Sequence, residues 1–205
     1  MRKPILIIGT FDTKGAEYAF LREQIISLGT EVLTVNVGVL GSSDLFPVDI
    51  ETDEVVRETG ADLASLRQEH DRGKAIKIVC HTAAAIVSRL YDEGQFAGII
   101  GMGGSGGSTI VTSAMRALPY GVPKICVSTV AGGDTSPYVG AKDVTMIPAI
   151  TDVAGVNRIS RTIFTRAAGA VVGMVAAVPP TAADDRPIIV ASMFGNTTEC
   201  VDACR

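Results

Sequence analysis

Short apolar runs alternate with longer amphipathic stretches along this chain. The short runs predict buried strands at residues 4–8, 31–37, 96–100, 124–127 and 144–147. The longer stretches predict helices at residues 16–28, 74–91, 110–118 and 155–177. Strands that alternate with helices form parallel βαβ units, and short apolar strands belong to a sheet covered on both faces. We therefore expect an α/β fold, with a doubly wound, Rossmann-like, mostly parallel sheet and helices on both faces.

Two segments stand outside this alternation. Residues 38–73 are more polar and predict either short helices, at 51–58 and 62–69, or a flexible lid. Residues 179–186 have the composition of a linker, and the apolar run after them resembles the first strand of the chain. We expect an α/β domain at residues 1–178 and, at residues 187–205, the truncated start of a second, similar domain of a longer protein.

Composition narrows the class of protein. The chain has 205 residues, 47% of them hydrophobic, a mean hydropathy of +0.34 and a formal net charge of -4. Extensive burial is expected, and mild acidity without basic clusters argues against nucleic acid as a partner. The longest apolar stretch, residues 167–178, is too short to span a bilayer, and no signal peptide is visible. We expect a cytoplasmic protein with no membrane partner and with reduced, structural cysteines.

The loops after the predicted strands should meet at one edge of the sheet, where ligands bind in doubly wound folds. The most informative loop is residues 101–109, Gly-Met-Gly-Gly-Ser-Gly-Gly-Ser-Thr, which joins a predicted strand to a predicted helix. Glycines let the backbone approach a ligand closely, and free N–H groups at a helix start attract an anion. This pattern predicts a phosphate site formed by Gly103, Gly104, Ser105, Gly106 and Gly107.

Two other interpretations of the glycine run stay open. One is a turn needed only for tight packing of a strand against a helix, although five glycines with two serines and a threonine favour the phosphate site. The Gly101-x-Gly103-x-x-Gly106 spacing of the run also matches the dinucleotide fingerprint, which favours NAD. However, the run does not follow the first strand, and no acidic residue follows the next strand at the usual spacing. Nor does a Gly-Lys-Ser/Thr sequence complete a Walker A loop.

The loop at residues 9–15 supplies hydroxyls, a carboxylate and a cation from Thr10, Asp12, Thr13 and Lys14. Lys14 is expected to neutralise phosphate charge, and Asp12 to hold a magnesium ion directly or through water. The alternative is that Asp12 or Thr13 only caps the helix that follows.

A third candidate loop, at residues 128–138, contributes Thr129, Gly132 and Asp134, where small residues permit close approach of a ligand. Asp152, in the loop at residues 148–152, is a further carboxylate candidate. Catalytic-triad chemistry lacks support, because neither histidine lies in a nucleophile-and-base pattern.

In order along the chain, these motifs resemble a known family. They are Gly9-Thr10-x-Asp12-Thr13-Lys14, the glycine run, Ser128-Thr129-x-Ala131-Gly132, Tyr138-Val139-Gly140, Asp152-x-x-Gly155-x-Asn157 and Phe194-Gly195-Asn196-Thr197-Thr198. The set resembles the ATP-binding domain family related to the tomato mosaic virus resistance protein, a group largely of uncharacterised bacterial proteins. The resemblance implies an N-terminal domain that binds ATP, with magnesium, through residues 10–14, 103–107 and 129–134. It also implies self-association, as a homodimer or a higher homo-oligomer.

The leading hypothesis is therefore a nucleotide-binding domain at residues 1–178 that holds phosphates in its glycine-rich loops. The alternative is an enzyme that acts on a phosphorylated metabolite at the interface with the second domain. Asp12, Lys14 and Asp134 would then bind metal, neutralise charge and transfer protons. An NAD-dependent oxidoreductase and a purely structural interaction protein are weaker alternatives. Whether any reaction is catalysed stays open.

Overall fold

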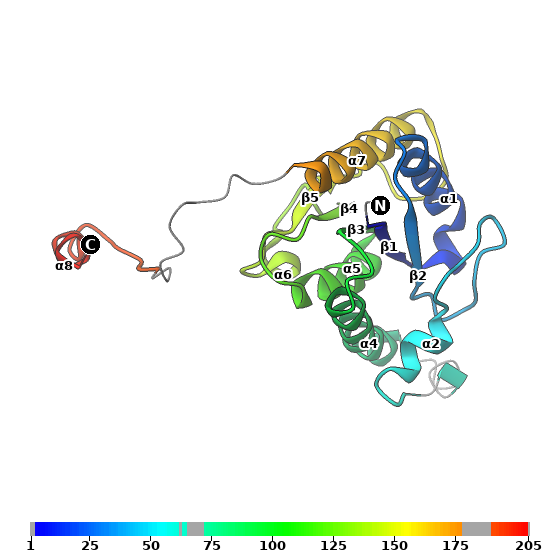
Figure 1. The fold of residues 1–205 in the computed structure, drawn as a ribbon, viewed down its shortest axis with the longest axis horizontal. Helices are drawn as coiled ribbons and strands as arrows, with labels where there is room; N and C mark the ends of the chain where they lie inside the picture. The colour runs from blue at the N-terminus through cyan, green and yellow to red at the C-terminus, as the bar shows by residue number, and fades with distance from the viewer. Residues whose placement is uncertain (1–2, 62, 65–71, 178–189, 205) are drawn as a thin grey trace.

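A parallel five-stranded sheet forms the centre of the molecule (Figure 1). The computed structural model describes residues 3–61, 63–64, 72–177 and 190–204. The strands are β1 (Ile5–Gly9), β2 (Val32–Asn36), β3 (Gly98–Gly103), β4 (Lys124–Ser128) and β5 (Thr145–Pro148). Their order is β2-β1-β3-β4-β5, with every neighbouring pair parallel. This is the flavodoxin-like variant of the doubly wound fold, so the predicted fold class is confirmed.

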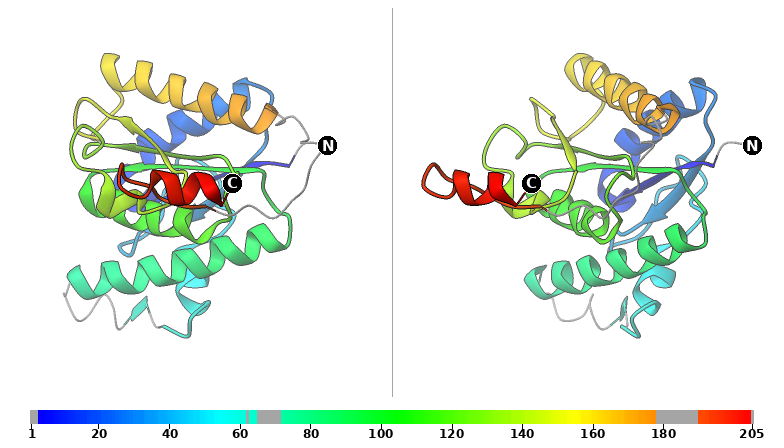
Figure 2. Two further views of the ribbon diagram at one scale, coloured as in Figure 1. Left: turned by 90° about the vertical axis from the view of Figure 1, so that its left-hand side faces the viewer. Right: turned by 60° about the vertical axis from the view of Figure 1, so that its left-hand side comes forward.

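Helices cover both faces of the sheet, as Figure 2 shows from two sides. One face carries α1 (Phe11–Ser27) and α7 (Arg158–Ala176), which contact each other. The opposite face carries α4 (Arg72–Asp92) and α5 (Ser105–Ala117), with the short α2 (Thr52–Arg57) packed on α4. Two further short helices among the described residues are α6 (Ser136–Val139) and α8 (Thr198–Ala203).

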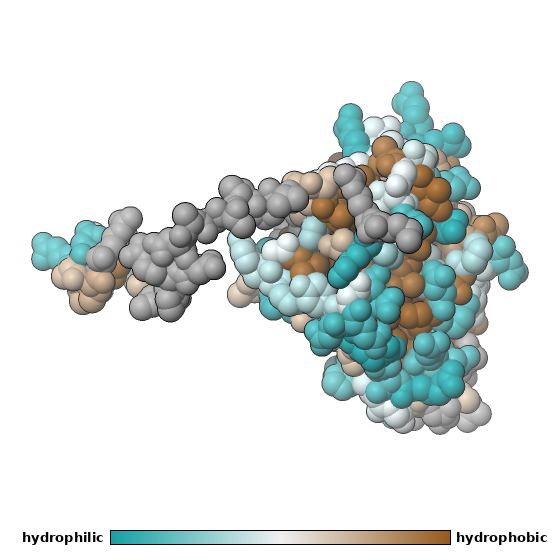
Figure 3. All heavy atoms as spheres, in the orientation of Figure 1, coloured by the Kyte–Doolittle hydropathy of each residue, from teal (hydrophilic) through white to brown (hydrophobic). Residues whose placement is uncertain are grey.

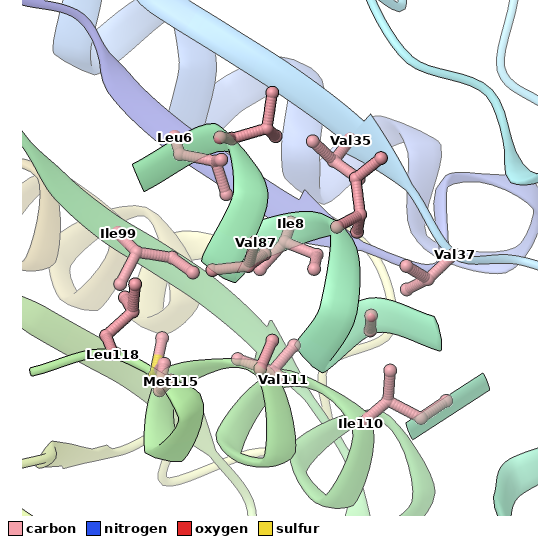
Figure 4. Packing of buried hydrophobic residues seen from close by; sticks show 14 of the residues in the cluster. Leu6, Ile8, Val35, Val37, Val87, Ile99, Ile110, Val111, Met115 and Leu118 are labelled. Atoms are coloured by element: carbon pink, nitrogen blue, oxygen red, sulfur yellow. The ribbon is translucent and has the colours of Figure 1, made fainter. Parts of the chain in front are cut away.

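The alternation of side chains along β1 divides the core into two layers. Ile5 and Ile7 pack with α1 and α7, whereas Leu6 and Ile8 pack with α4 and α5, and all four are fully buried. Figure 4 shows the second layer, where Leu6 and Ile8 face Val87 of α4 and Val111 of α5. A strand buried on both faces is apolar throughout, which is why β1 is an unbroken apolar run in the sequence.

Two helices begin earlier than the sequence predicts. α1 begins at Phe11 rather than at residue 16 and is kinked at Lys14 (φ −129°, ψ 27°). α5 begins at Ser105 rather than at residue 110, directly after the end of β3. The predicted loops at residues 9–15 and 101–109 are therefore wrong, since each is a strand–helix junction of one residue. Glycine and serine are weak helix formers, but packing of a helix on a sheet outweighs propensity in its first turn.

Residues 38–51, part of the polar segment for which the sequence leaves a lid open, are tied to the body of the domain. The Leu40 N–H donates to Asp12 in α1 (2.9 Å), and the Gly41 carbonyl accepts from Asn36 at the end of β2 (2.9 Å). Ser42 donates to Glu51 (2.5 Å). These contacts favour a fixed wall over a lid. The predicted helix at 51–58 is α2, and the one at 62–69 lies largely outside the described residues.

The outer surface mixes polar and apolar side chains, as Figure 3 shows for one face. Gly169 and Gly173 of α7 are exposed, and a Cβ at either would meet no atom within 4 Å, so neither serves core packing. Self-association stays a prediction. No helix in the described ranges combines the length and apolar character needed to cross a bilayer. The predicted linker at residues 179–186 lies outside the described part of the chain.

Candidate functional site

A cavity of about 640 Å³ opens beyond the carboxyl ends of β1 and β3, where the strand order reverses. Ligands of doubly wound folds bind at this position, and the volume suits a small-molecule ligand. The polar lining comes from Thr10, Asp12, Thr13, Lys14, Ser105 and Asp152, and the glycine lining from Gly103, Gly104, Gly106 and Gly107. The apolar lining comes from Val37, Val39, Leu40, Ala75, Ile76, Val79 and Ile110.

The first turn of α5 faces this cavity without a side-chain cap. Its N-cap residue is Gly104, which has no side chain to accept from the helix N–H groups. By contrast, Asn157 caps α7, and the Asn36 side chain accepts from the Phe11 N–H at the start of α1 (3.1 Å). The first N–H groups of a helix have no partner within it and are satisfied by caps, water or ligands. The start of α5 therefore has the geometry of an anion-binding site.

The glycines of this run fall into two groups by what surrounds them. A Cβ on Gly101 would lie 2.5 Å from the Ile8 carbonyl oxygen, and one on Gly103 would lie 2.9 Å from Gly107 Cα. These two glycines are needed for strand and helix packing. A Cβ on Gly104 would find its nearest neighbour, Thr129 Oγ1, at 3.8 Å, and one on Gly107 would find Met102 O at 3.6 Å. Packing thus explains only part of the run, because Gly104 and Gly107 would accept a Cβ without a close contact.

Thr10, Thr13 and Lys14 reach the same cavity from the start of α1. Thr13 Oγ1 donates to Thr10 Oγ1 (3.2 Å), which holds both hydroxyls at the rim. Lys14 is half-buried and, within the described ranges, forms no ion pair. The structure therefore places one unpaired cation beside the uncapped start of α5.

The two carboxylate oxygens of Asp12 lie in different environments. Its Oδ2 accepts from the Leu40 N–H (2.9 Å), so the carboxylate ties α1 to the wall after β2. Its Oδ1 is buried and has no hydrogen-bond partner. The carboxylate lies directly over Gly38, where a Cβ would overlap it. Asp12 is therefore a structural link that retains one free acceptor.

Asp12 is the residue that the sequence assigns to a magnesium ion, so the donors around it decide whether such an ion fits. No group of three or more His, Cys, Asp or Glu side chains suited to a metal occurs in the described residues. Magnesium usually keeps several waters and takes one or two carboxylates together with substrate phosphates. The unpartnered Asp12 Oδ1 fits one such ligand. Among the described residues, Asp12 thus offers one carboxylate for a magnesium ion that ligand phosphates would also have to hold.

Asn36 organises the apolar wall of the cavity. Its buried side chain accepts from the N–H groups of Phe11 (3.1 Å) and Gly38 (2.9 Å) through Oδ1. Its Nδ2 donates to the Gly41 carbonyl (2.9 Å) and to Glu51 (3.0 Å). These bonds hold residues 37–41, including the cavity residues Val37, Val39 and Leu40, against the start of α1. Asn36 was not among the residues predicted from the sequence, although a polar residue at the end of an apolar strand can indicate a site residue.

The strands that carry the two junctions separate at this edge. The β1–β3 pairing ends at Ile8 and Gly101. Beyond it, the Tyr18 hydroxyl accepts from the Met102 N–H (2.8 Å) and lies 2.7 Å from Met102 O and 3.0 Å from Ile8 O. Burial raises the pKa of Tyr18 strongly, so the phenol is neutral. The sequence analysis missed Tyr18, because its partner strand is remote in the chain.

The residues predicted from the third loop do not lie together in one cavity. Thr129 and Gly132 line a second hollow of about 410 Å³ rather than the first cavity. Asp134 lines neither; its carboxylate accepts from Ser136 N (2.9 Å) and Oγ (2.7 Å), and the hydroxyl hydrogen bond lowers its pKa. Asp152 lines both spaces, and Glu17 fixes the loop after it by accepting from the Gly155 N–H (2.5 Å).

Comparison with known proteins supplies the family context. A model described as "Uncharacterised protein family (UPF0261) N-terminal domain" matches residues 3–180. A UPF0261 protein of Clostridium tetani is 44% identical over 205 residues, which is 100% of this chain and 50% of the relative. A UPF0261 protein of Rhizobium meliloti is 41% identical over 201 residues, 98% of this chain and 49% of the relative.

A plant protein is also similar to this chain. The ToMV resistance protein Tm-1(GCR237) of Solanum lycopersicum is 32% identical over 225 residues, which is 98% of this chain and 29% of the plant protein. The chain thus spans about half the length of the bacterial relatives and less than a third of the plant one.

Proposed function

This chain belongs to the UPF0261 family through its N-terminal domain, and on that premise we propose that it binds a nucleotide, ATP with magnesium, in the first cavity. The predicted relation to the tomato resistance protein is confirmed by the match along nearly the whole chain. The proposal concerns binding by this domain, with the triphosphate at the junctions after β1 and β3.

The uncapped start of α5 is the observation that carries this proposal. The starts of α1 and α7 are satisfied by asparagine side chains, whereas α5 presents glycine and serine amides to a cavity. Gly104 and Gly107 have space for a Cβ, so packing alone does not account for them. A chain of phosphates fits this arrangement because backbone N–H groups and the helix dipole both favour negative charge.

Lys14 and the apolar lining of the cavity would contact opposite ends of a bound nucleotide. Lys14 lines the cavity beside the start of α5 and supplies positive charge for the phosphates. On the other side, Ile76 and Val79 of α4 and Val39 after β2 form an apolar surface. Such a surface suits the flat face of a base, while the polar end of the ligand lies at α5.

The same geometry argues against the dinucleotide interpretation. In NAD-binding sheets the glycine fingerprint follows the first strand, and an acidic residue near the end of the second holds the ribose. Here the glycine run follows β3, and β2 ends on Asn36, whose Oδ1 and Nδ2 both bind other parts of the domain. A mononucleotide accounts for this topology better.

Calorimetric titration with ATP and magnesium tests the proposal on the wild type and two valine variants. A Cβ at Gly104 meets no atom closer than 3.8 Å, so Gly104→Val should be tolerated by the fold while adding bulk at a residue that lines the cavity. We expect it to weaken ATP binding at least about tenfold, which is about 1.4 kcal/mol. Gly169→Val, on the exposed side of α7, is the matched control and should bind as the wild type does. Absence of ATP binding by the folded wild type, or equal binding by Gly104→Val, would refute the proposal.

Asp12→Asn tests the magnesium part separately. The amide retains an oxygen for the Leu40 N–H but removes the free carboxylate charge. We expect ATP affinity without magnesium to change little and the gain from magnesium to fall. An unchanged gain would assign Asp12 to the structural link alone.

A further inference from the structure

The second hollow, of about 410 Å³, adjoins the first cavity at the carboxyl ends of β4 and β5. Its lining is Thr129, Gly132, Pro148, Ile150, Thr151 and Asp152. Asp152 lines both spaces and is the residue that they share.

The two spaces differ in charge. The first has Lys14 and the uncapped start of α5, which favour an anion. The second has no Lys, Arg or His among its lining residues and contains the carboxylate of Asp152. A phosphate group in the second hollow would face that carboxylate without a compensating cation. The second hollow therefore selects a ligand of different chemistry.

Its polar groups are hydroxyls, and one of them has no partner. Thr151 Oγ1 is buried and forms no hydrogen bond within the protein. A buried hydroxyl without a partner is costly, and a ligand group can satisfy it. Thr129 adds a second hydroxyl, and Asp152 adds oxygen acceptors for ligand O–H groups. Pro148 and Ile150 supply an apolar surface.

The backbone at Ile150 holds the loop in a strained form. Its φ is 65°, and the Thr151 N–H donates to the Ala149 carbonyl (2.7 Å), which is the pattern of a γ-turn with positive φ. This conformation is unfavourable for a β-branched residue, yet the side chain is 74% exposed and gains little from burial. Ala149 and Val153, both buried, anchor the two ends of the loop.

We propose that the second hollow binds a small uncharged compound with several hydroxyl groups, a sugar or a sugar alcohol. Vicinal hydroxyls match the carboxylate of Asp152 and the hydroxyls of Thr129 and Thr151, and the C–H face of the compound lies on Ile150. This site goes beyond nucleotide binding and does not require it, since its lining shares only Asp152 with the first cavity.

The test uses NMR spectroscopy of the ¹⁵N-labelled protein without nucleotide. D-ribose, D-glucose and ribitol are the probes, and inorganic phosphate and choline are the charged comparisons. We expect saturable shifts of the Gly132 and Thr151 amides in the millimolar range with at least one neutral probe. The Gly107 amide, whose residue lines only the first cavity, should not move with that probe. Thr129→Val should weaken this binding about tenfold. Thr162→Val, on the exposed side of α7, is the matched control and should not.

Three results would overturn the proposal. They are no shift with any neutral probe, shifts of Gly132 and Thr151 by phosphate or choline instead, and an affinity that Thr129→Val leaves unchanged. A failure of ATP binding does not affect these outcomes, because the probes are titrated without nucleotide. Conversely, a protein that binds ATP but none of the neutral probes retains the proposed function and loses this second site.

Discussion

The hydroxyl of Tyr18 in α1 accepts a hydrogen bond from the N–H of Met102 in β3, at 2.8 Å and across 84 residues of sequence. It also lies within hydrogen-bond distance of the carbonyl oxygens of Met102 and Ile8. The Tyr18 hydroxyl thus replaces the backbone hydrogen bonds that would come next in the pairing of β1 with β3. Both strands then lead into the junctions, Thr10 and Gly104, that line the first cavity. The spacing of the candidate phosphate site depends on this side chain.

We expect Tyr18→Phe to lower the free energy of unfolding by about 2 kcal/mol or more, because it leaves buried backbone groups without partners. Chemical denaturation followed by circular dichroism measures this change. Tyr91→Phe is the matched control: its ring packs on Phe96, and its hydroxyl has no hydrogen-bond partner within the described part of the chain. A Tyr18→Phe variant as stable as the control would show that water replaces the phenol at no cost.

Asn36→Ala should destabilise the domain by about 3 kcal/mol, because it removes four hydrogen bonds and leaves the Phe11 and Gly38 N–H groups unpaired. It should also release the wall at residues 37–41. Hydrogen exchange of the Leu40 and Gly41 amides should become faster in this variant, while exchange in β4 stays slow. Equal protection in variant and wild type would contradict the role of Asn36 in holding the wall.

Lys14→Met should weaken ATP binding about tenfold and reduce the dependence of affinity on salt, because it removes one positive charge beside the phosphates. Titrations at low and high salt measure both effects. Lys77→Met, on the exposed side of α4 and outside the cavity lining, is the control and should change neither. If both variants lose affinity equally, net charge rather than position is responsible.

The buried Lys124 side chain predicts a pH dependence through Asp143. Lys124 Nζ donates to Asp143 (2.7 Å), and the Gly121 N–H donates to the same carboxylate (2.8 Å). Partial burial opposes ionisation of Asp143, but these bonds outweigh it and lower its pKa. A lowered folded-state pKa stabilises the protein above the unfolded value, about 3.9, and this contribution is lost as the pH falls through the folded value.

Asp143→Asn should therefore be less stable than the wild type at neutral pH, with the difference shrinking below about pH 4. Urea unfolding across this range measures it. Asp92→Asn, an exposed carboxylate that forms no ion pair among the described residues, is the comparison. A stability difference between wild type and Asp143→Asn that is constant with pH would contradict this account.

Ile150→Gly should leave the free energy of unfolding unchanged or raise it by up to about 1 kcal/mol, because glycine accepts a positive φ without strain. The lost side chain is mostly exposed, so little burial is lost with it. Ile147→Gly makes the same chemical change in β5, where the side chain packs against the core, and should cost about 2 kcal/mol or more. Thermal unfolding compares the two. A marked loss of stability in Ile150→Gly would show that the loop is not strained.

The order of strands and helices could be predicted because the central strands β1, β3 and β4 are buried on both faces and the long helices on one. Such burial leaves an apolar run or a helical period that needs no partner to be recognised. The starts of α1 and α5 could not be predicted in this way. Their first turns contain glycine, serine and threonine, which favour loops, and only packing on the sheet makes them helical.

The candidate site shows the same division. Thr10, Lys14 and Gly104 were identified because they follow predicted strands, and the structure brings them to one cavity. Thr129 and Gly132 also follow a strand, yet they line the second hollow, because β4 lies on the far side of β3 from β1. Which loops share a cavity depends on strand order, and strand order is not encoded in any local pattern.

The fold class, the family and the strand ends from which ligand-binding residues come can all be derived from the amino-acid sequence alone. This is possible because hydrophobic periodicity and ordered motifs are local properties of the chain. The three-dimensional structure was needed to show which glycines are required for packing and that Asp12 is tied to Leu40. It was also needed to show that Tyr18 and Asn36 hold the strands and loops around the site. These roles depend on hydrogen bonds and close approaches between remote residues, and such contacts exist only once the sheet has formed.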